Sequence, residues 1–212
     1  MRCTWSAALV AAASLLAIGE VRAQQPAAAS VGTVNALWVE RELSFNFSGF
    51  TSYYSCDGLR SKLEWLLGEL GARPGFEVRT RGCVRVSGPE LFPGARIVAA
   101  VPLEATPELL AELAADASRR ELAARAKGGS VPAPEAAAQF PARVKRVEFR
   151  SARGNFDGLQ DGDCELMEQA RRQLFPKLGV RVVEGQISCT PNQLTLGAVR
   201  MTVEVLAPVP ES

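Results

Sequence analysis

The feature that most restricts the fold of this chain is an internal repeat marked by cysteines. Aligning Cys56 with Cys164 places four further identities at the same offset: Leu66 with Leu174, Leu70 with Leu178, Gly71 with Gly179, and Arg73 with Arg181. Deleting two residues then aligns Cys83 with Cys189. Such self-similarity predicts one structural module used twice, and it has to be recognised before any fold is inferred from local patterns.

Each copy has the pattern of a strand, a helix and two more strands. Residues 37–47 alternate apolar and polar side chains, interrupted only by Arg41, which predicts a half-buried strand. After Ser55, which can cap a helix, leucines recur every three or four residues as far as Gly71. This spacing predicts a helix that begins at Cys56 and is ended by Gly71. The next two strands are expected at 76–86 and 96–103. The corresponding elements of the second copy are expected at 144–149, 164–178, 180–189 and 194–206.

A different kind of sequence joins the two copies. Thr106 can cap a helix that has Pro107 at its first position and continues to Lys127. Its apolar stripe is thin and rich in alanine, so the helix either lies loosely on the sheet or extends into solvent. We therefore divide the chain into a first module, a connecting helix with a Pro/Ala linker, a second module and two flexible tails. Their predicted bounds are 31–105, 106–141, 142–206, and 24–30 with 207–212.

The order of these elements predicts an α+β fold, with helices on one face of a largely antiparallel sheet. The first six elements follow the order strand, helix, strand, strand, helix, strand that is found in ferredoxin-like folds. A single continuous six-stranded sheet is one arrangement that satisfies this order. Two separate halves are the alternative.

Residues 1–23 have the form of a secretory signal peptide. Arg2 precedes an apolar run at 7–18, and Val21-Arg22-Ala23 matches the small-x-small cleavage pattern, so the mature chain is expected to begin at Gln24. An uncleaved anchor is the rival interpretation. No later stretch reaches 18 apolar residues, so we expect no integral membrane anchor after cleavage and a periplasmic or secreted location.

Four cysteines remain after removal of the signal peptide, which favours two disulfides in an oxidising compartment. A helix of about 15 residues and a strand of about seven span similar distances, so a chain that leaves along one and returns along the other brings its cysteines together. Cysteine number alone leaves three pairings open, and the repeat favours Cys56–Cys83 and Cys164–Cys189. No Cys-x-x-Cys pair supports a redox or zinc site.

Strand parity adds two finer expectations about these cysteines. Cys83 has the parity of Arg79 and Arg81, so we expect a bulge at Gly82 that turns the cysteine inward. In the second copy, Ile187 and Cys189 share one strand face with Val183, as a bridge to the overlying helix requires.

Composition excludes several functions. The chain has no histidine, which removes Ser-His-Asp and Cys-His catalysis, histidine metal sites and histidine pH switches. After signal cleavage the positive and negative side chains balance, so we expect no nucleic-acid partner. We find no cofactor fingerprint and assign no cofactor, no metal site and no catalytic residue.

Two surfaces are candidates for binding. Tyr53 and Tyr54, the only tyrosines, stand together before the first helix and are typical of recognition loops, although they can equally cover the end of the hydrophobic layer. Arg79, Arg81 and Arg85 share a strand face. They form a basic patch for an acidic ligand if their strand neighbours the one carrying Arg143, Lys145, Arg146, Arg150 and Arg153. A solvated face paired with acids such as Glu77 and Glu148 is the ordinary alternative.

The loop before the second helix contains three aspartates among glycines. Asp157, Asp161 and Asp163 supply oxygen ligands, but their spacing misses the calcium-binding EF-hand pattern, and Asp163 is expected to cap the helix. The pair Asp161 and Asp163 can in principle perform acid-base chemistry.

The run Tyr53-Tyr54-Ser55-Cys56-Asp57-Gly58, continued by Leu66, Leu67, Leu70, Gly71 and Arg73, resembles a group of small exported proteins of Gram-negative bacteria without an assigned activity. The resemblance implies a periplasmic setting and no activity. Our leading hypothesis is a non-enzymatic, disulfide-stabilised protein that binds a protein or small-ligand partner in the cell envelope. A carboxylate-dependent hydrolase or transferase and a purely structural envelope component are the alternatives.

Overall fold

A six-stranded antiparallel sheet organises the part of the chain that the computed structural model describes, residues 32–50, 52–83, 88–90, 92–127, 138–151, 158–189 and 198–210. Its strands are β1 (Val34–Asn46), β2 (Glu77–Arg81), β3 (Gly94–Glu104), β4 (Phe140–Arg150), β5 (Arg181–Ser188) and β6 (Ala198–Pro208). The helices are α1 (Cys56–Glu69), α2 (Pro107–Ala126) and α3 (Cys164–Gln173), with short 3₁₀ turns η1 (Asp161–Asp163) and η2 (Phe175–Leu178). The predicted α+β class is confirmed.

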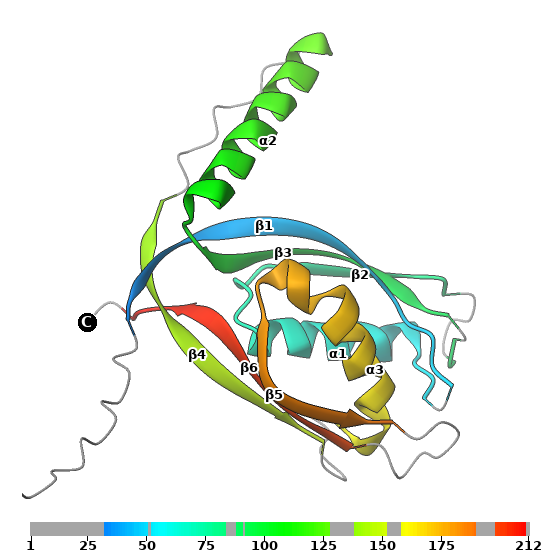
Figure 1. Ribbon diagram of the computed structural model, residues 1–212. Coiled ribbons are helices and arrows are strands. Elements are labelled where there is room, and N and C mark those ends of the chain that lie inside the picture. The colour runs from blue at the N-terminus through cyan, green and yellow to red at the C-terminus, as the bar shows by residue number, and fades with distance from the viewer. Residues whose placement is uncertain are drawn as a thin grey trace, which may run out of the picture. The chain divides into compact units, whose positions relative to one another are not determined.

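The strands form one continuous sheet in the order β2-β3-β1-β4-β6-β5 (Figure 1). The two halves have the same element order. From the centre of the sheet outward, the strands of the first half are β1, β3 and β2, and those of the second half are β4, β6 and β5. The two halves meet where β1 pairs with β4, and this seam joins only Val34–Ala36 with Phe140–Ala142. By contrast, β1 pairs with β3 along all of Ala36–Asn46. The short seam means that contacts outside the sheet have to hold the halves together.

The hydrophobic core lies between the sheet and the two helices α1 and α3, which cover the same face (Figure 1). Alternate residues of β1, except Arg41, and the leucine stripe of α1 are buried. Phe149 of β4 packs edge-on against Trp65 of α1, with ring centroids 5.9 Å apart, and lies 6.5 Å from Phe175 of η2. Since these rings come from both halves, the core is shared by both.

Helix α2 takes no part in this core. Thr106 caps it as expected, because the Leu109 N–H donates to the Thr106 Oγ1 at 3.2 Å, but none of its side chains is buried. Figure 1 shows the helix projecting away from the sheet. The strand order β2-β3-β1-β4 is therefore not accompanied by packing of α2, the second helix in chain order, onto the sheet. Of the two placements predicted for α2, the structure has the one directed into solvent.

Both predicted disulfides are present. Cys56 is bonded to Cys83 and Cys164 to Cys189, with Cα atoms 6.0 and 5.6 Å apart. Each bond joins the first residue of a helix to a residue just beyond the following strand, as the matched lengths of helix and strand predicted. Bonds of this kind persist in oxidising compartments, so they fit an extracellular or periplasmic protein.

The two parity arguments had different outcomes. No bulge interrupts β2, because the strand ends at Arg81 and Gly82 adopts a positive φ of 74° that redirects the chain toward Cys83. A bulge lies instead in β5, between Val182 and Glu184. The shift leaves Val183 exposed and turns Val182 toward the core, so the predicted inward orientation of Val183 is wrong.

Several element ends differ from the predicted ones. The second-copy helix stops at Gln173, and the chain continues into η2, where Pro176 lacks the N–H that a longer helix needs. Strand β4 begins at Phe140, inside the predicted linker, and β6 extends to Pro208, two residues into the predicted tail. The predicted signal peptide and the tail 24–30 lie outside the described residues. Among the described helices, none combines the length and apolarity needed to cross a bilayer.

Candidate functional site

The loop from β1 to α1 carries exposed aromatic side chains at one end of the sheet. Phe50 is 75% exposed, Tyr53 51% and Phe92 74%. Phe92 belongs to a neighbouring segment that hydrogen bonds to this loop at both ends, through Glu90 N to Tyr54 O at 3.0 Å and Phe47 N to Pro93 O at 2.9 Å. We call the three exposed residues, Phe50, Tyr53 and Phe92, the aromatic end. The other large apolar side chains that are exposed in the described residues are aliphatic.

The two adjacent tyrosines have different environments. Tyr53 faces solvent, whereas Tyr54 turns inward and packs edge-on against Phe47, with ring centroids 4.9 Å apart. The Tyr54 hydroxyl donates a hydrogen bond to Asp163 Oδ1. Only Tyr53 is therefore available to a partner, and a variant that removes both rings would also damage the interior.

Asp163 is the centre of a buried polar cluster formed with Tyr54 and Lys62. Its Oδ2 accepts hydrogen bonds from Lys62 Nζ at 2.8 Å and from the Gln160 N–H at 2.7 Å, while Oδ1 accepts from Tyr54. Lys62 also donates to the Gly158 carbonyl at 2.6 Å. Because Lys62 lies on α1 and Asp163 directly precedes α3, this cluster, which we call the Asp163 cluster, connects the two halves.

These contacts correct the role predicted for Asp163. The residue occupies the cap position of α3, but its carboxylate makes no capping hydrogen bond to that helix. The carboxylate instead bonds to the preceding turn and to the other half. With every oxygen engaged, it stabilises the junction of the halves rather than the helix terminus.

Burial and the adjacent Asp163 carboxylate raise the pKa of Tyr54 above its ordinary value of 10.0. The folded protein thus holds the phenol proton more tightly than the unfolded chain. The resulting stability is complete below pH about 10 and is lost as the pH rises above that value. We expect the urea midpoint to fall as the pH rises from about 10 to about 11, and to fall less steeply for Tyr54→Phe. Urea unfolding followed by circular dichroism across a pH series measures this change. The control variant Tyr53→Phe should keep the wild-type slope of urea midpoint against pH. Equal slopes for Tyr53→Phe and Tyr54→Phe would contradict the prediction.

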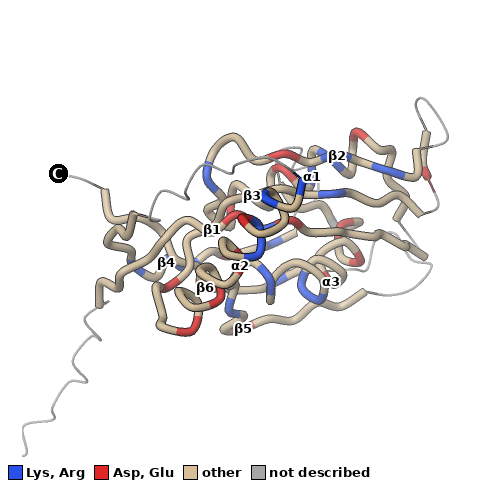
Figure 2. Tube along the Cα trace, turned by 90° about the horizontal axis from the view of Figure 1, so that it is seen from above, with Lys and Arg blue, Asp and Glu red and all other residues tan. Residues whose placement is uncertain are grey.

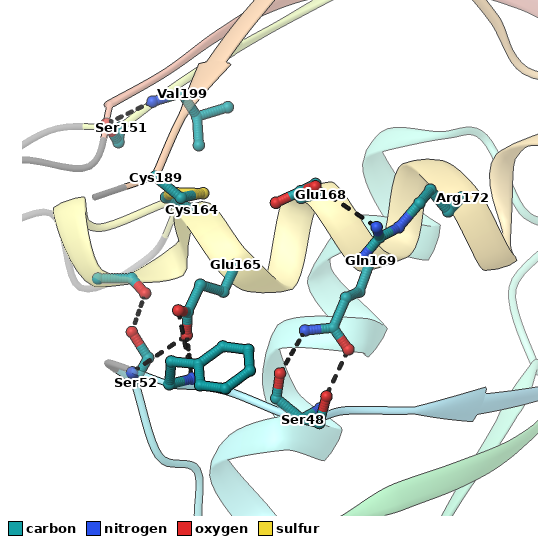
Figure 3. Close-up of a disulfide and its surroundings, with 12 residues drawn as sticks. Ser48, Ser52, Ser151, Cys164, Glu165, Glu168, Gln169, Arg172, Cys189 and Val199 are labelled. Carbon is teal, nitrogen blue, oxygen red and sulfur yellow. Dashed lines mark hydrogen bonds and ion pairs between the residues drawn. A yellow bond between two sulfur atoms is a disulfide. The ribbon is translucent and has the colours of Figure 1, made fainter. Parts of the chain in front are cut away.

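Side chains of α3 bind the backbone that leads into the aromatic end (Figure 3). Gln169 accepts from the Ser48 N–H at 3.0 Å and donates to the Ser48 carbonyl at 2.8 Å. Gln173 makes the same pair of bonds with Asn46, at 3.0 and 2.8 Å. Four residues of a helix rise about 6.0 Å and two residues of a strand about 6.6 Å, so the two repeats run nearly in step.

Glu165 continues this ladder one helical turn earlier. Its carboxylate accepts from the Phe50 N–H at 3.0 Å and from the Ser52 N–H at 3.3 Å (Figure 3). Ser52 also donates to the Gly162 carbonyl. A Cβ at Gly49 would lie 2.8 Å from the Phe47 ring and 2.9 Å from Glu165, so only glycine fits there. The backbone beneath Phe50 is consequently fixed by α3.

The predicted basic face is paired rather than free. Arg79 forms an ion pair with Glu77, and Arg81 donates to Asn46 Oδ1 at 2.7 Å. Arg85 lies outside the described residues. Positive and negative residues are interspersed along the strands (Figure 2).

Strands β2 and β4 are separated by β3 and β1, so the two groups of arginines do not lie on neighbouring strands. On β4, Arg150 pairs with Glu148 at 3.0 Å. The condition for a continuous basic patch is therefore not met, and Arg146 of β4 is also ion-paired, with Glu204 at 3.0 Å.

The aspartate-rich loop is only partly described. Asp157 lies outside the described residues, and the side chain of Asp161 is not among those described. The described part of the chain contains no group of three or more histidine, cysteine, aspartate or glutamate side chains placed to hold a metal ion.

Sequence reasoning did not single out Phe92, Lys62 or the three ladder residues of α3. Phe92 lies in an irregular segment and has no pattern that marks it. The ladder left one signal, because Glu165, Gln169 and Gln173 recur at four-residue spacing, and this polar stripe predicts a face that bonds rather than packs.

Comparisons with known proteins found no match: no family model, no curated protein and no solved structure aligns with this chain.

Proposed function

We propose that this is a non-enzymatic periplasmic protein whose aromatic end binds a protein partner in the cell envelope. The observation that carries the proposal is the exposure of three aromatic rings on backbone that is fixed from behind. Exposed aromatic side chains held together on a scaffold mark interaction sites, because such rings bury large areas at a small cost in side-chain entropy.

The bracing of the aromatic end supports binding rather than incidental exposure. The α3 ladder fixes the backbone of Phe50, the hydrogen bond between Glu90 and Tyr54 fixes the segment next to Tyr53, and the bond from Phe47 to Pro93 fixes that next to Phe92. A surface that is ordered before binding loses less conformational entropy when the partner arrives. The partner expected from this chemistry presents apolar side chains.

The non-enzymatic part of the proposal is supported by the Asp163 cluster. Both oxygens of the Asp163 carboxylate already accept hydrogen bonds within the protein, which favours a structural role for this carboxylate. The periplasmic location in the proposal is supported by the predicted signal peptide and by the two disulfides.

A photo-crosslinking amino acid placed at Tyr53 or Phe92 in producing cells tests the proposal. We expect one discrete adduct of higher mass from each of these positions, and its loss when Phe50→Ser is added. Leu122 and Val183 are exposed elsewhere and serve as matched positions that should give no such adduct. Unchanged thermal unfolding of Phe50→Ser is the control for folding. Absence of an adduct from both test positions, or the same adduct from Leu122, would overturn the proposal.

A further inference from the structure

A second feature, away from the aromatic end, is a cleft of about 430 Å³ between β1 and η2. Its lining combines cationic and apolar side chains with one acidic residue and one glycine: Arg41, Lys177, Leu43, Leu103, Pro176, Glu42 and Gly179. A volume of this size is within the range of sites for small organic ligands.

Arg41 is the unusual residue of this cleft. It interrupts the apolar alternation of β1 on the strand face where Val39 and Leu43 are buried in the core. Its side chain is only 28% exposed, and its Nε atom is buried without a hydrogen-bond partner in the described structure. A buried donor that lacks an acceptor is unfavourable, so the hydrogen bonding of this guanidinium is incomplete.

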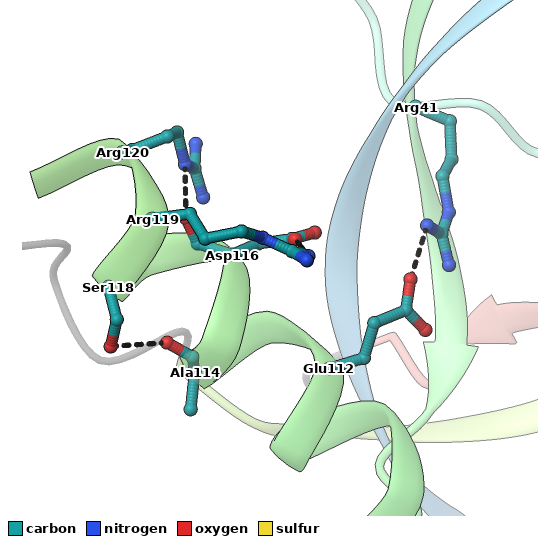
Figure 4. Close-up of polar contacts among 7 residues, drawn as sticks. All are labelled: Arg41, Glu112, Ala114, Asp116, Ser118, Arg119 and Arg120. Carbon is teal, nitrogen blue, oxygen red and sulfur yellow. Dashed lines mark hydrogen bonds and ion pairs between the residues drawn. The ribbon is translucent and has the colours of Figure 1, made fainter. Parts of the chain in front are cut away.

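The carboxylate that Arg41 contacts belongs to a helix that is weakly held. Arg41 Nη1 lies 3.3 Å from Glu112 Oε1 of α2 (Figure 4). The Glu112 side chain is 51% exposed, and α2 buries none of its side chains. Since exposed ion pairs contribute little free energy, a carboxylate with additional contacts can displace Glu112.

Lys177 supplies a second positive charge to the same cleft. Its ammonium makes no ion pair or hydrogen bond with any other described residue. Glu42 also lines the cleft, but its carboxylate pairs with Arg96 at 2.8 Å, and that contact lowers its pKa. The lining also contains the apolar side chains Leu43, Leu103 and Pro176, so it suits a ligand with an anionic end and an apolar body.

We propose that this cleft binds a small organic carboxylate that replaces Glu112 at Arg41. The ligand carboxylate accepts hydrogen bonds from the Arg41 guanidinium and is attracted by Lys177. The apolar body of the ligand lies on Leu43, Leu103 and Pro176. This site is separate from the aromatic end and does not depend on the function proposed above.

Titration calorimetry of the mature protein with octanoate, and with octanol as the uncharged probe, tests the proposal. We expect saturable binding of octanoate, at least about tenfold tighter than binding of octanol. Lys177→Gln, a change at an exposed side chain that leaves folding intact, should weaken octanoate binding several-fold, and Arg41→Gln should weaken it more. Glu112→Gln should strengthen binding, because it removes the competing carboxylate.

Glu121→Gln on the same helix is the matched control, since Glu121 pairs with Arg125, whereas Glu112 pairs with Arg41. It should leave the affinity unchanged. Equal affinity for octanol and octanoate, no saturable binding, or an affinity that Lys177→Gln and Glu112→Gln leave unchanged would each overturn the proposal.

Discussion

Replacing Asp163 with alanine is expected to lower the free energy of unfolding by about 3 kcal/mol, because it leaves two side-chain donors and one backbone N–H without their acceptor. The Lys62 ammonium loses its counter-ion, and the Tyr54 hydroxyl loses its hydrogen bond. Breaking one partner of a buried pair costs more than the pair itself contributes, since the remaining charge stays desolvated. Urea unfolding followed by circular dichroism measures the change.

Asp57→Ala is the matched control, because Asp57 also pairs with a basic residue of α1, Arg60, but does so at the surface. It should cost no more than about 0.5 kcal/mol. Adding Lys62→Met to the Asp163→Ala variant should recover part of the loss, since the stranded charge is then removed. Similar losses for Asp163→Ala and Asp57→Ala would show that the cluster does not connect the halves as described.

Removing either disulfide should cost about 3.5 kcal/mol, from the entropy that each loop closure removes from the unfolded chain. The two bonds enclose sequence separations of 27 and 25 residues, so the double variants Cys56→Ala/Cys83→Ala and Cys164→Ala/Cys189→Ala should be destabilised similarly. Losing both costs about 7 kcal/mol, comparable with the whole stability of a typical domain.

The protein should therefore lose its cooperative thermal transition, or unfold at a far lower midpoint temperature, when a strong reductant is present. Thermal unfolding with and without reductant, alongside a thiol assay, measures this. Each double variant retains a single disulfide, so its thermal unfolding should respond only to reduction of the bond that remains. A midpoint that is the same in reduced and oxidised protein would contradict the prediction.

The framework of the fold was predictable because its signals are local or repeated. The leucine spacing from Leu59 to Leu67 depends only on helix geometry, and the two cysteine pairs follow from the equal spans of a helix and the strand after it. Alternation along β1 marked the inner face correctly and singled out Arg41 as its exception, the residue that proved to line a cleft.

The finer features depend on contacts between distant residues, which local patterns do not encode. A bulge was predicted at Gly82 from parity, yet the strand ended there, whereas the bulge in β5 falls at Val183, where no glycine marks it. Tyr54 and Asp163 are 109 positions apart in sequence, so nothing near either residue indicates that they bond. For the same reason the separate fates of Tyr53 and Tyr54 were not predictable from their adjacency.

The bonds from Gln169 and Gln173 to the backbone of Ser48 and Asn46 also limit how this protein can evolve. Glutamate at either site cannot donate to a carbonyl, and asparagine is a methylene shorter, so neither reproduces both bonds. When two side chains bond to each other, a substitution in one can be compensated by a substitution in the other. Here the partner is the main chain, which is the same for every residue except proline. A lost pair of bonds can therefore be restored only by a return to glutamine.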